Sequence, residues 1–155
     1  MMITFQLPDA LWLRGSDGYL LTFDDEQRRK QCCYGLACTQ VGLNDDTLEE
    51  QFDLSDVRAS LQIFGDPARG AAGLYALDFQ QPHSSFADVR LKIVAAINTA
   101  RAARGLPSSC VVSSDITPAE LSYLVNDEPG LSDDQRVQWL NAIAKPYDFQ
   151  FEYVP

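Results

Sequence analysis

The stretch "FQFEYV", residues 149–154, places aromatic side chains at alternate positions, with Gln150 and Glu152 between them. This period of two is typical of a strand that buries one face. The stretch "MITFQL", residues 2–7, alternates apolar and polar side chains in the same way. Two matching strands at the two ends of the sequence predict neighbours in one mostly antiparallel sheet. The expected fold class is therefore α+β, with this sheet packed against about four helices.

Helical patterning occupies much of the sequence between these two strands. Gly35 lies in the first helical segment, where glycine costs about 1 kcal/mol relative to alanine, so we expect another part of the chain to approach it closely. The Gly- and Pro-rich segment 65–73 predicts a loop. Short apolar runs predict further strands over 18–23, 74–79 and 109–113. Apolar periodicity and capping residues predict helices over 30–41, 53–64, 86–104, 117–125 and 132–144.

The chain has 155 residues, of which 46% are apolar and 22% are charged, and its formal net charge is −10. A chain of this length fits one domain that buries roughly 70% of the surface of its unfolded state. No internal repeat or linker divides the sequence, so we expect residues 1–155 to form a single domain. No run approaches the roughly 18 apolar residues of a membrane span, and the first residues do not have the pattern of a signal peptide. We therefore expect a cytoplasmic protein that does not bind membranes.

Three of the four cysteines lie in "RRKQCCYGLACTQVGLNDD", residues 28–46. Cys32 and Cys33 are adjacent and cannot readily bridge each other, and Cys110 is distant, so we expect reduced thiols. A structural zinc site needs about four tetrahedral ligands, whereas adjacent cysteines on a helix point about 100° apart. The chain also has a single histidine, His83. We therefore predict no metal ion and no cofactor, and we expect the cysteines to pack as small apolar side chains.

An alternative interpretation is that Cys32 or Cys33 takes part in covalent chemistry. A thiol near a helix N-terminus and near basic side chains can have a depressed pKa and act as a nucleophile. Cys32 and Cys33 lie in such a position, after Arg28, Arg29 and Lys30. The single histidine lies in a Pro- and Ser-rich loop, and no sequence feature places it against a cysteine. A thiol-dependent enzyme or redox protein is thus the alternative, and a non-enzymatic role is favoured.

Acidic side chains are concentrated in "LNDDTLEEQFDLSD", residues 43–56, where no basic residue occurs. Such a run is usually a solvated face. The functional interpretations are an acidic surface for a basic partner protein or a mimic of DNA phosphates. Direct binding of nucleic acid is not expected, because it draws its affinity from clustered Lys and Arg. The candidate partner-binding residues are Asp45, Asp46, Glu49, Glu50, Asp53 and Asp56.

Three stretches carry a resemblance: "LWLRG" at 11–15, "CCYGLACTQVGL" at 32–43 and "LVNDEPGLSDDQR" at 124–136. They resemble a group of small uncharacterised proteins of tailed phages and prophages that share the motifs W-L-R-G, C-C-L-G and N-D followed by L-S-x-x-x-R. Residues 57–115 match no part of that group. The resemblance implies a setting inside a bacterium and no particular activity. The matching residues are Trp12–Gly15, Cys32–Gly35 with Tyr34 in place of leucine, Asn126, Asp127, Leu131, Ser132 and Arg136.

The sequence as a whole predicts a non-enzymatic acidic protein-binding module. It would act in the bacterial cytosol on a host or phage protein. A thiol-dependent enzyme and a DNA-mimic inhibitor remain as alternatives. Asn126 and Asp127 are expected to satisfy the backbone of a turn rather than to act as an acid–base pair.

Overall fold

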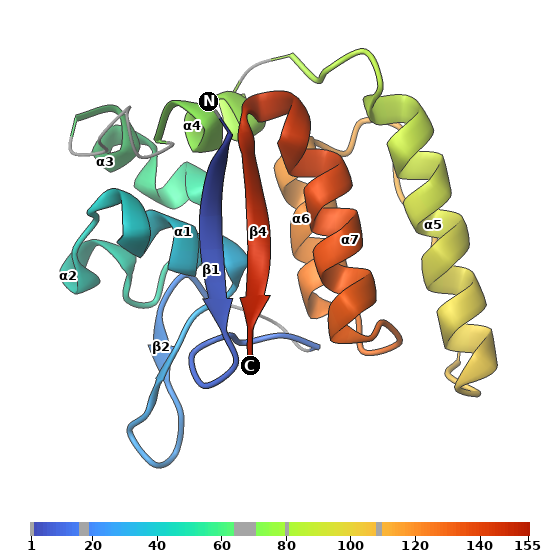
Figure 1. Ribbon diagram of the computed structural model, residues 1–155, viewed down its shortest axis with the longest axis horizontal. Helices are drawn as coiled ribbons and strands as arrows, with labels where there is room; N and C mark the ends of the chain where they lie inside the picture. The colour runs from blue at the N-terminus through green and yellow to red at the C-terminus, as the bar shows by residue number, and fades with distance from the viewer. Residues whose placement is uncertain (1, 16–18, 64–70, 80, 108–109) are drawn as a thin grey trace.

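The computed structural model describes residues 2–15, 19–63, 71–79, 81–107 and 110–155. Two strands lie side by side at the centre of the molecule, and helices are seen on both sides of them (Figure 1). The elements in chain order are β1 (Ile3–Pro8), β2 (Thr22–Phe23), β3 (Arg29–Lys30), α1 (Cys33–Val41), α2 (Asp45–Leu48), the 3-10 helix η1 (Leu54–Val57), α3 (Arg58–Ile63), α4 (Ala71–Phe79), α5 (Phe86–Ala103), α6 (Pro118–Asp127), α7 (Asp133–Ala144), the 3-10 helix η3 (Lys145–Tyr147) and β4 (Phe149–Val154).

The strands β1 and β4 are neighbours, and they run parallel, with Ile3 opposite Phe149 and Pro8 opposite Val154. The prediction of one mostly antiparallel sheet is therefore wrong. The described residues form two sheets of two strands each, the parallel pair β1–β4 and the short antiparallel pair β2–β3. Alternation reports which face a strand buries, but it does not report strand direction. Direction follows from the connections: α7 runs back alongside β4, so β4 starts beside the start of β1 (Figure 1).

The described part of the chain contains seven α-helices, more than the predicted four or so. Segment 74–79, predicted as a strand, belongs to α4, where Leu74 and Leu77 are both buried. An apolar run this short does not distinguish a strand from a buried helix. Residues 71–73 of the predicted loop also belong to α4, and 65–70 lie outside the described residues. The additional short helix α2 is capped by Asn44, whose side chain accepts a hydrogen bond from a backbone N–H of the first turn.

Two other predicted strands differ from the structure. Of the described residues in 18–23, only Thr22 and Phe23 form a strand, β2. The prediction of a buried strand over 109–113 is wrong for the described residues 110–113, which form no strand. Val111 in this segment is 87% exposed. The prediction of burial rested on apolar composition alone. A buried strand also needs a neighbouring strand and a covering layer, and the described residues do not supply them for this segment.

The helix ends that were predicted from capping residues are confirmed. Thr117 Oγ1 accepts a hydrogen bond at 3.1 Å from the N–H of the third residue of α6, and Ser132 Oγ accepts one at 3.3 Å from the N–H of the third residue of α7. α1 ends at Gly42, which has a left-handed φ of 109°. The long predicted helix over 86–104 is present as α5, and the predicted helix over 53–64 is present as η1 followed by α3.

The core lies between the β1–β4 pair and the helices α1 and α6. The rings of Phe5 and Phe149 on the two strands are 5.6 Å apart in an edge-on arrangement. Tyr34 of α1 extends this cluster, with its ring 5.9 Å from Phe151 of β4 and 5.3 Å from Tyr123 of α6. Aromatic pairs in such geometries add to the large apolar area that each ring buries. The side chains that alternate along the terminal strands therefore supply the centre of the core.

The close approach predicted at Gly35 is present. A Cβ atom added to Gly35 would lie 1.7 Å from the carbonyl oxygen of Leu20. Leu20 and Leu21 are fully buried, so α1 packs directly on the backbone of the segment that leads into β2. Gly35 does not have a positive φ. Glycine is required here because of space rather than backbone conformation.

Candidate functional site

The six predicted acidic residues lie on α2, on η1 and in the turn between them, and three of them have partners within the protein. The Asp45 carboxylate pairs with the Arg29 guanidinium. Asp53 and Asp56 form a reciprocal cap on η1: Asp53 Oδ1 accepts from the Asp56 N–H at 3.3 Å, and Asp56 Oδ2 accepts from the Asp53 N–H at 3.2 Å. These three carboxylates are therefore engaged within the protein.

The other three acidic residues, Asp46, Glu49 and Glu50, are exposed. Their carboxylates have neither an ion pair nor a hydrogen bond within the part of the chain that the structure describes. They follow one another closely along α2 and the turn after it, so their charges act on the same region of solvent. Three uncompensated carboxylates in one short stretch attract cationic groups over a distance of about 10 Å at moderate salt.

An exposed aromatic side chain follows these carboxylates in the chain. Phe52 is 58% exposed and packs against Tyr19, with the ring centroids 4.6 Å apart and the ring planes tilted by 36°. Backbone hydrogen bonds hold this stretch in place: the Glu50 N–H donates to the carbonyl of Leu21 at 3.1 Å, and the Phe52 N–H donates to Asp56 Oδ2 at 3.0 Å. Aromatic side chains, phenylalanine included, are enriched in the cores of protein interfaces. We call the following residues the acidic–aromatic surface: Asp46, Glu49, Glu50 and Phe52.

The predicted thiol pair is enclosed. Cys32 is the N-cap residue of α1, and Cys32 and Cys33 are 1% and 0% exposed. A hydrogen bond from the Cys33 thiol lowers the pKa of Cys32, burial opposes this, and the N–H groups of Gly35 and Tyr34 add to the lowering. Burial raises the pKa of Cys33 well above its ordinary value, and the bond to Cys32 raises it further. The Cys33 thiol and the helix start thus lower the pKa of Cys32 below that of an ordinary thiol, but its burial shields that sulfur from any substrate in solvent.

We expect native-state alkylation of Cys32 and Cys33 to be at least ~100-fold slower than alkylation of the urea-unfolded chain, because reaction requires local opening. Cys110 is 9% exposed and should be labelled first, although burial raises its pKa. Mass spectrometry of peptides after timed treatment with iodoacetamide measures each rate. Fast labelling of Cys32 or Cys33 alone in the folded protein would reverse this interpretation and support a thiol enzyme.

The remaining sequence-based candidates concern metal binding and membranes. His83 is exposed in the loop before α5, where its Nδ1 lies 2.8 Å from Ser85 Oγ. Among the described residues, no group of three or more Cys, His, Asp or Glu side chains is placed to hold a metal ion. No helix in the described ranges has the length and apolar character needed to cross a bilayer.

Residues from the W-L-R-G, C-C and N-D motifs meet at Asn126, near the end of α6. The Trp12 indole N–H donates to Asn126 Oδ1 at 2.8 Å, and the Cys33 backbone N–H donates to the same oxygen at 3.3 Å. Asn126 Nδ2 donates to the carbonyl of Leu13 at 3.0 Å. Asn126 is fully buried. The prediction that this residue serves a local turn is therefore wrong, because its side chain joins three distant parts of the chain.

The arginine of W-L-R-G reaches the L-S-x-x-x-R motif. Arg14 donates from Nε and Nη2 to the two carboxylate oxygens of Asp133 at 2.8 Å each, and these hydrogen bonds lower the pKa of Asp133. The Arg14 guanidinium also lies over the Trp12 ring, 4.7 Å from its centroid. Arg136 donates to Asp133 Oδ1 at 2.9 Å and to the carbonyl of Glu128 at 2.6 Å. These motif residues cross-link the N-terminal segment to α6 and α7, which is a structural role.

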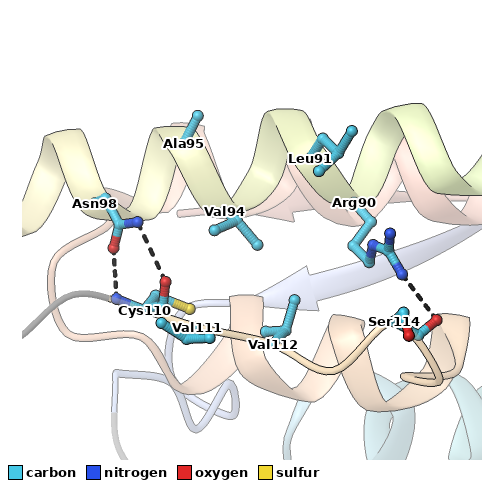
Figure 2. A pocket seen from close by; sticks show the side chains of 9 residues that line it. All are labelled: Arg90, Leu91, Val94, Ala95, Asn98, Cys110, Val111, Val112 and Ser114. Carbon is cyan, nitrogen blue, oxygen red and sulfur yellow. Dashed lines mark hydrogen bonds between the residues drawn. The ribbon is translucent and has the colours of Figure 1, made fainter.

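A groove of about 460 Å³ that the sequence did not predict lies between α5 and segment 110–114 (Figure 2). Side chains of α5 hold this segment by its backbone. Asn98 binds both backbone groups of Cys110, donating to its carbonyl at 3.2 Å and accepting from its N–H at 2.5 Å. Arg90 Nη1 donates to the carbonyl of Ser114 at 2.8 Å. The apolar lining consists of Leu91, Val94, Ala95, Val111 and Val112.

Comparison of the chain with protein-family models, with curated proteins and with solved structures found no match in any of the three. The resemblance to phage and prophage proteins therefore stays a prediction that the quoted motifs carry. The function has to be argued from the surfaces described above.

Proposed function

We propose that the protein is a non-enzymatic binding module that holds a basic partner protein on its acidic–aromatic surface. One observation carries the proposal: the carboxylates of Asp46, Glu49 and Glu50 have no ion-pair or hydrogen-bond partner among the described residues, and the exposed ring of Phe52 follows them on a fixed backbone. Carboxylates steer and orient a cationic partner. A buried aromatic anchor supplies much of the affinity of a protein interface.

The chemistry of this surface defines the partner it fits. Lys and Arg side chains would pair with the three carboxylates, and a guanidinium can also stack on an aromatic face. The tilted ring pair of Phe52 and Tyr19 offers such a face. We therefore propose a partner surface with several Lys or Arg residues around one apolar pocket. The net charge of −10 would speed the encounter.

The setting belongs to the proposal as well. We propose a phage or prophage accessory protein that acts in the bacterial cytosol on a host or phage protein. The burial of Cys32 and Cys33 weighs against the thiol-enzyme alternative. The internal use of Asp45, Asp53 and Asp56 weighs against a DNA mimic, because half of the acidic cluster serves the fold.

Neutralising the surface carboxylates is expected to remove most of the binding. Immobilised protein should retain a basic partner from a bacterial lysate at about 50 mM salt and release it at about 500 mM, since screening weakens exposed charges. The triple variant Asp46→Asn/Glu49→Gln/Glu50→Gln should bind that partner at least ~10-fold more weakly, with a flatter salt dependence. Isothermal titration with the purified partner, identified by mass spectrometry, measures both effects.

A matched variant separates the local surface from the overall charge. Asp25→Asn/Glu26→Gln/Asp134→Asn makes the same change in net charge at exposed positions elsewhere. It should bind the partner as the unmodified protein does, whereas Phe52→Ser alone should weaken binding without changing the salt dependence. Equal loss in the two triple variants would mean that only net charge matters, and unchanged binding by the first would reject this surface.

A further inference from the structure

We infer that the face formed by α5, segment 110–116 and the adjoining side of α6 binds a second copy of the same chain across a two-fold axis. Val111 and Leu91 are 87% and 64% exposed, the two largest values among the large hydrophobic residues that the structure describes. Exposed apolar residues that gather on one face mark an interaction site, whereas scattered ones do not. We call this surface the α5 face, and its apolar residues are Leu91, Ala95, Val111, Val112, Ile116 and Leu124.

The shape of the α5 face is a ridge between two hollows. On the α5 side of segment 110–116 lies the groove of about 460 Å³, which Figure 2 shows beneath Leu91 and Val94. On the α6 side lies a second hollow of about 580 Å³, lined by Ile116 and Leu124 among others. Val111 and Val112 line both hollows and form the ridge between them. Two copies can therefore interlock: the ridge of each copy enters a hollow of the other.

Charged residues lie on both sides of segment 110–116, on the side next to α5 (the α5 flank) and on the side next to α6 (the α6 flank). Their signs determine the orientation of the two-fold axis. The α5 flank carries Arg90, and the α6 flank carries Asp115 and Glu120. A two-fold axis parallel to segment 110–116 places the α5 flank of each copy over the α6 flank of the other. Arg90 would then face Asp115 at two symmetric positions, because both residues lie near the same end of the segment. An axis across the segment would bring like charges together, which costs free energy.

Segment 110–116 is already fixed by hydrogen bonds within the single chain. Asn98 binds both backbone groups of Cys110, and Arg90 binds the carbonyl of Ser114. Arg90 uses one of its five N–H groups in that bond, so it retains donors for a carboxylate. A surface that is already ordered loses less conformational entropy on association.

A second copy explains this face better than an unrelated partner, because ridge, hollows and opposite charges occur together on one chain. Two-fold homodimers are the commonest closed assemblies and require such a self-complementary patch. The helix α2, which carries Asp46 of the acidic–aromatic surface, lies at the opposite end of the molecule from α5 (Figure 1). The dimer would therefore leave both copies of that surface free, and the inference stands or falls independently of the proposed function.

Sedimentation velocity from about 1 µM to about 500 µM tests the inference, because this range spans the affinities of weak to moderate homodimers. The unmodified protein should change from monomer to dimer as its concentration rises. Val111→Asp and Leu91→Asp should each raise the dissociation constant at least ~10-fold, since each places a charge in the apolar contact. Both side chains are mostly exposed, so both variants should fold, and Phe52→Ser is the control that should dimerise normally.

A charge-reversal pair tests the orientation. Arg90→Asp alone and Asp115→Arg alone should each dimerise at least ~10-fold more weakly, because each homodimer would face like charges at both contacts. A mixture of the two variants should form heterodimers in preference, with opposite charges at both contacts. A monomer at every concentration would overturn the inference, as would a dimer that Val111→Asp does not weaken. If the mixture of the two variants associated no more strongly than each variant alone, the proposed orientation of the axis would be wrong.

Discussion

A Gly35→Ala variant is expected to lose at least ~4 kcal/mol of its free energy of unfolding, a value reserved for severe steric or polar disruption. The added methyl group would lie 1.7 Å from the carbonyl oxygen of Leu20 and 2.8 Å from its Cα. Both atoms are backbone, so no side-chain rotation relieves the clash, and α1 or the segment before β2 must move. Alanine gains about 1 kcal/mol of helix propensity over glycine, which is too little to offset that movement.

Urea unfolding followed by circular dichroism measures this loss, and the glycine that caps the C-terminal end of the same helix provides the control. Gly42 has a positive φ but no atom near an added Cβ. Gly42→Ala should therefore cost only about 1–2 kcal/mol through backbone strain. If Gly35→Ala proved as stable as Gly42→Ala, the packing of α1 on Leu20 described above would be wrong.

An Asn126→Ala variant is expected to lose about 3–5 kcal/mol, because each buried polar group left without a partner costs about 1–3 kcal/mol. The groups concerned are the Trp12 indole N–H and the Cys33 backbone N–H, which share Asn126 Oδ1. The carbonyl of Leu13 would also lose the donor Nδ2. Thermal and urea unfolding should both show the loss, with native secondary structure retained at low temperature.

A double-mutant cycle distinguishes these hydrogen bonds from general packing at the same position. Trp12→Phe removes the indole N–H and keeps an aromatic ring, so it should destabilise the unmodified protein. In the Asn126→Ala background the same change should cost at least ~1 kcal/mol less, since the N–H has already lost its acceptor. Strictly additive costs would show that the bond between Trp12 and Asn126 contributes nothing to stability.

The parts of the fold that the sequence predicts correctly depend on local patterns. Alternation identified the strands at 149–154 and near Phe5, and the side chains of Thr117 and Ser132 located the starts of α6 and α7. The parallel direction of the terminal pair was not predictable, because alternation is the same for either direction. Segment 74–79 was misassigned because its six residues satisfy a strand and a helix equally well.

The sequence predicted which residue types make up the candidate site, but it did not predict how those residues are arranged in space. The sequence shows six carboxylates in one stretch, but only the structure shows that Asp45 is paired with Arg29 while Asp46 is not. Asn126 has its partner Trp12 at a sequence separation of 114, which no local pattern reports. The α5 face was missed for a different reason: the apolar residues of 110–113 suggested burial, and exposure depends on what packs around a segment.

The parallel pairing of β1 with β4 also has a consequence for how the protein is made. Phe5 and its neighbour on β4 are separated by 146 positions, as are Gln6 and Glu152, which are joined by a side-chain hydrogen bond. At about 5–20 residues per second, a ribosome needs roughly 7–30 s to supply the second strand after the first. During that interval Phe5 and Leu7, both buried in the finished fold, have no partner strand. The central pair of this protein can therefore form only after residues 149–154 have been made, and any nascent chain that stops before β4 leaves β1 as an unpaired apolar edge exposed to other chains.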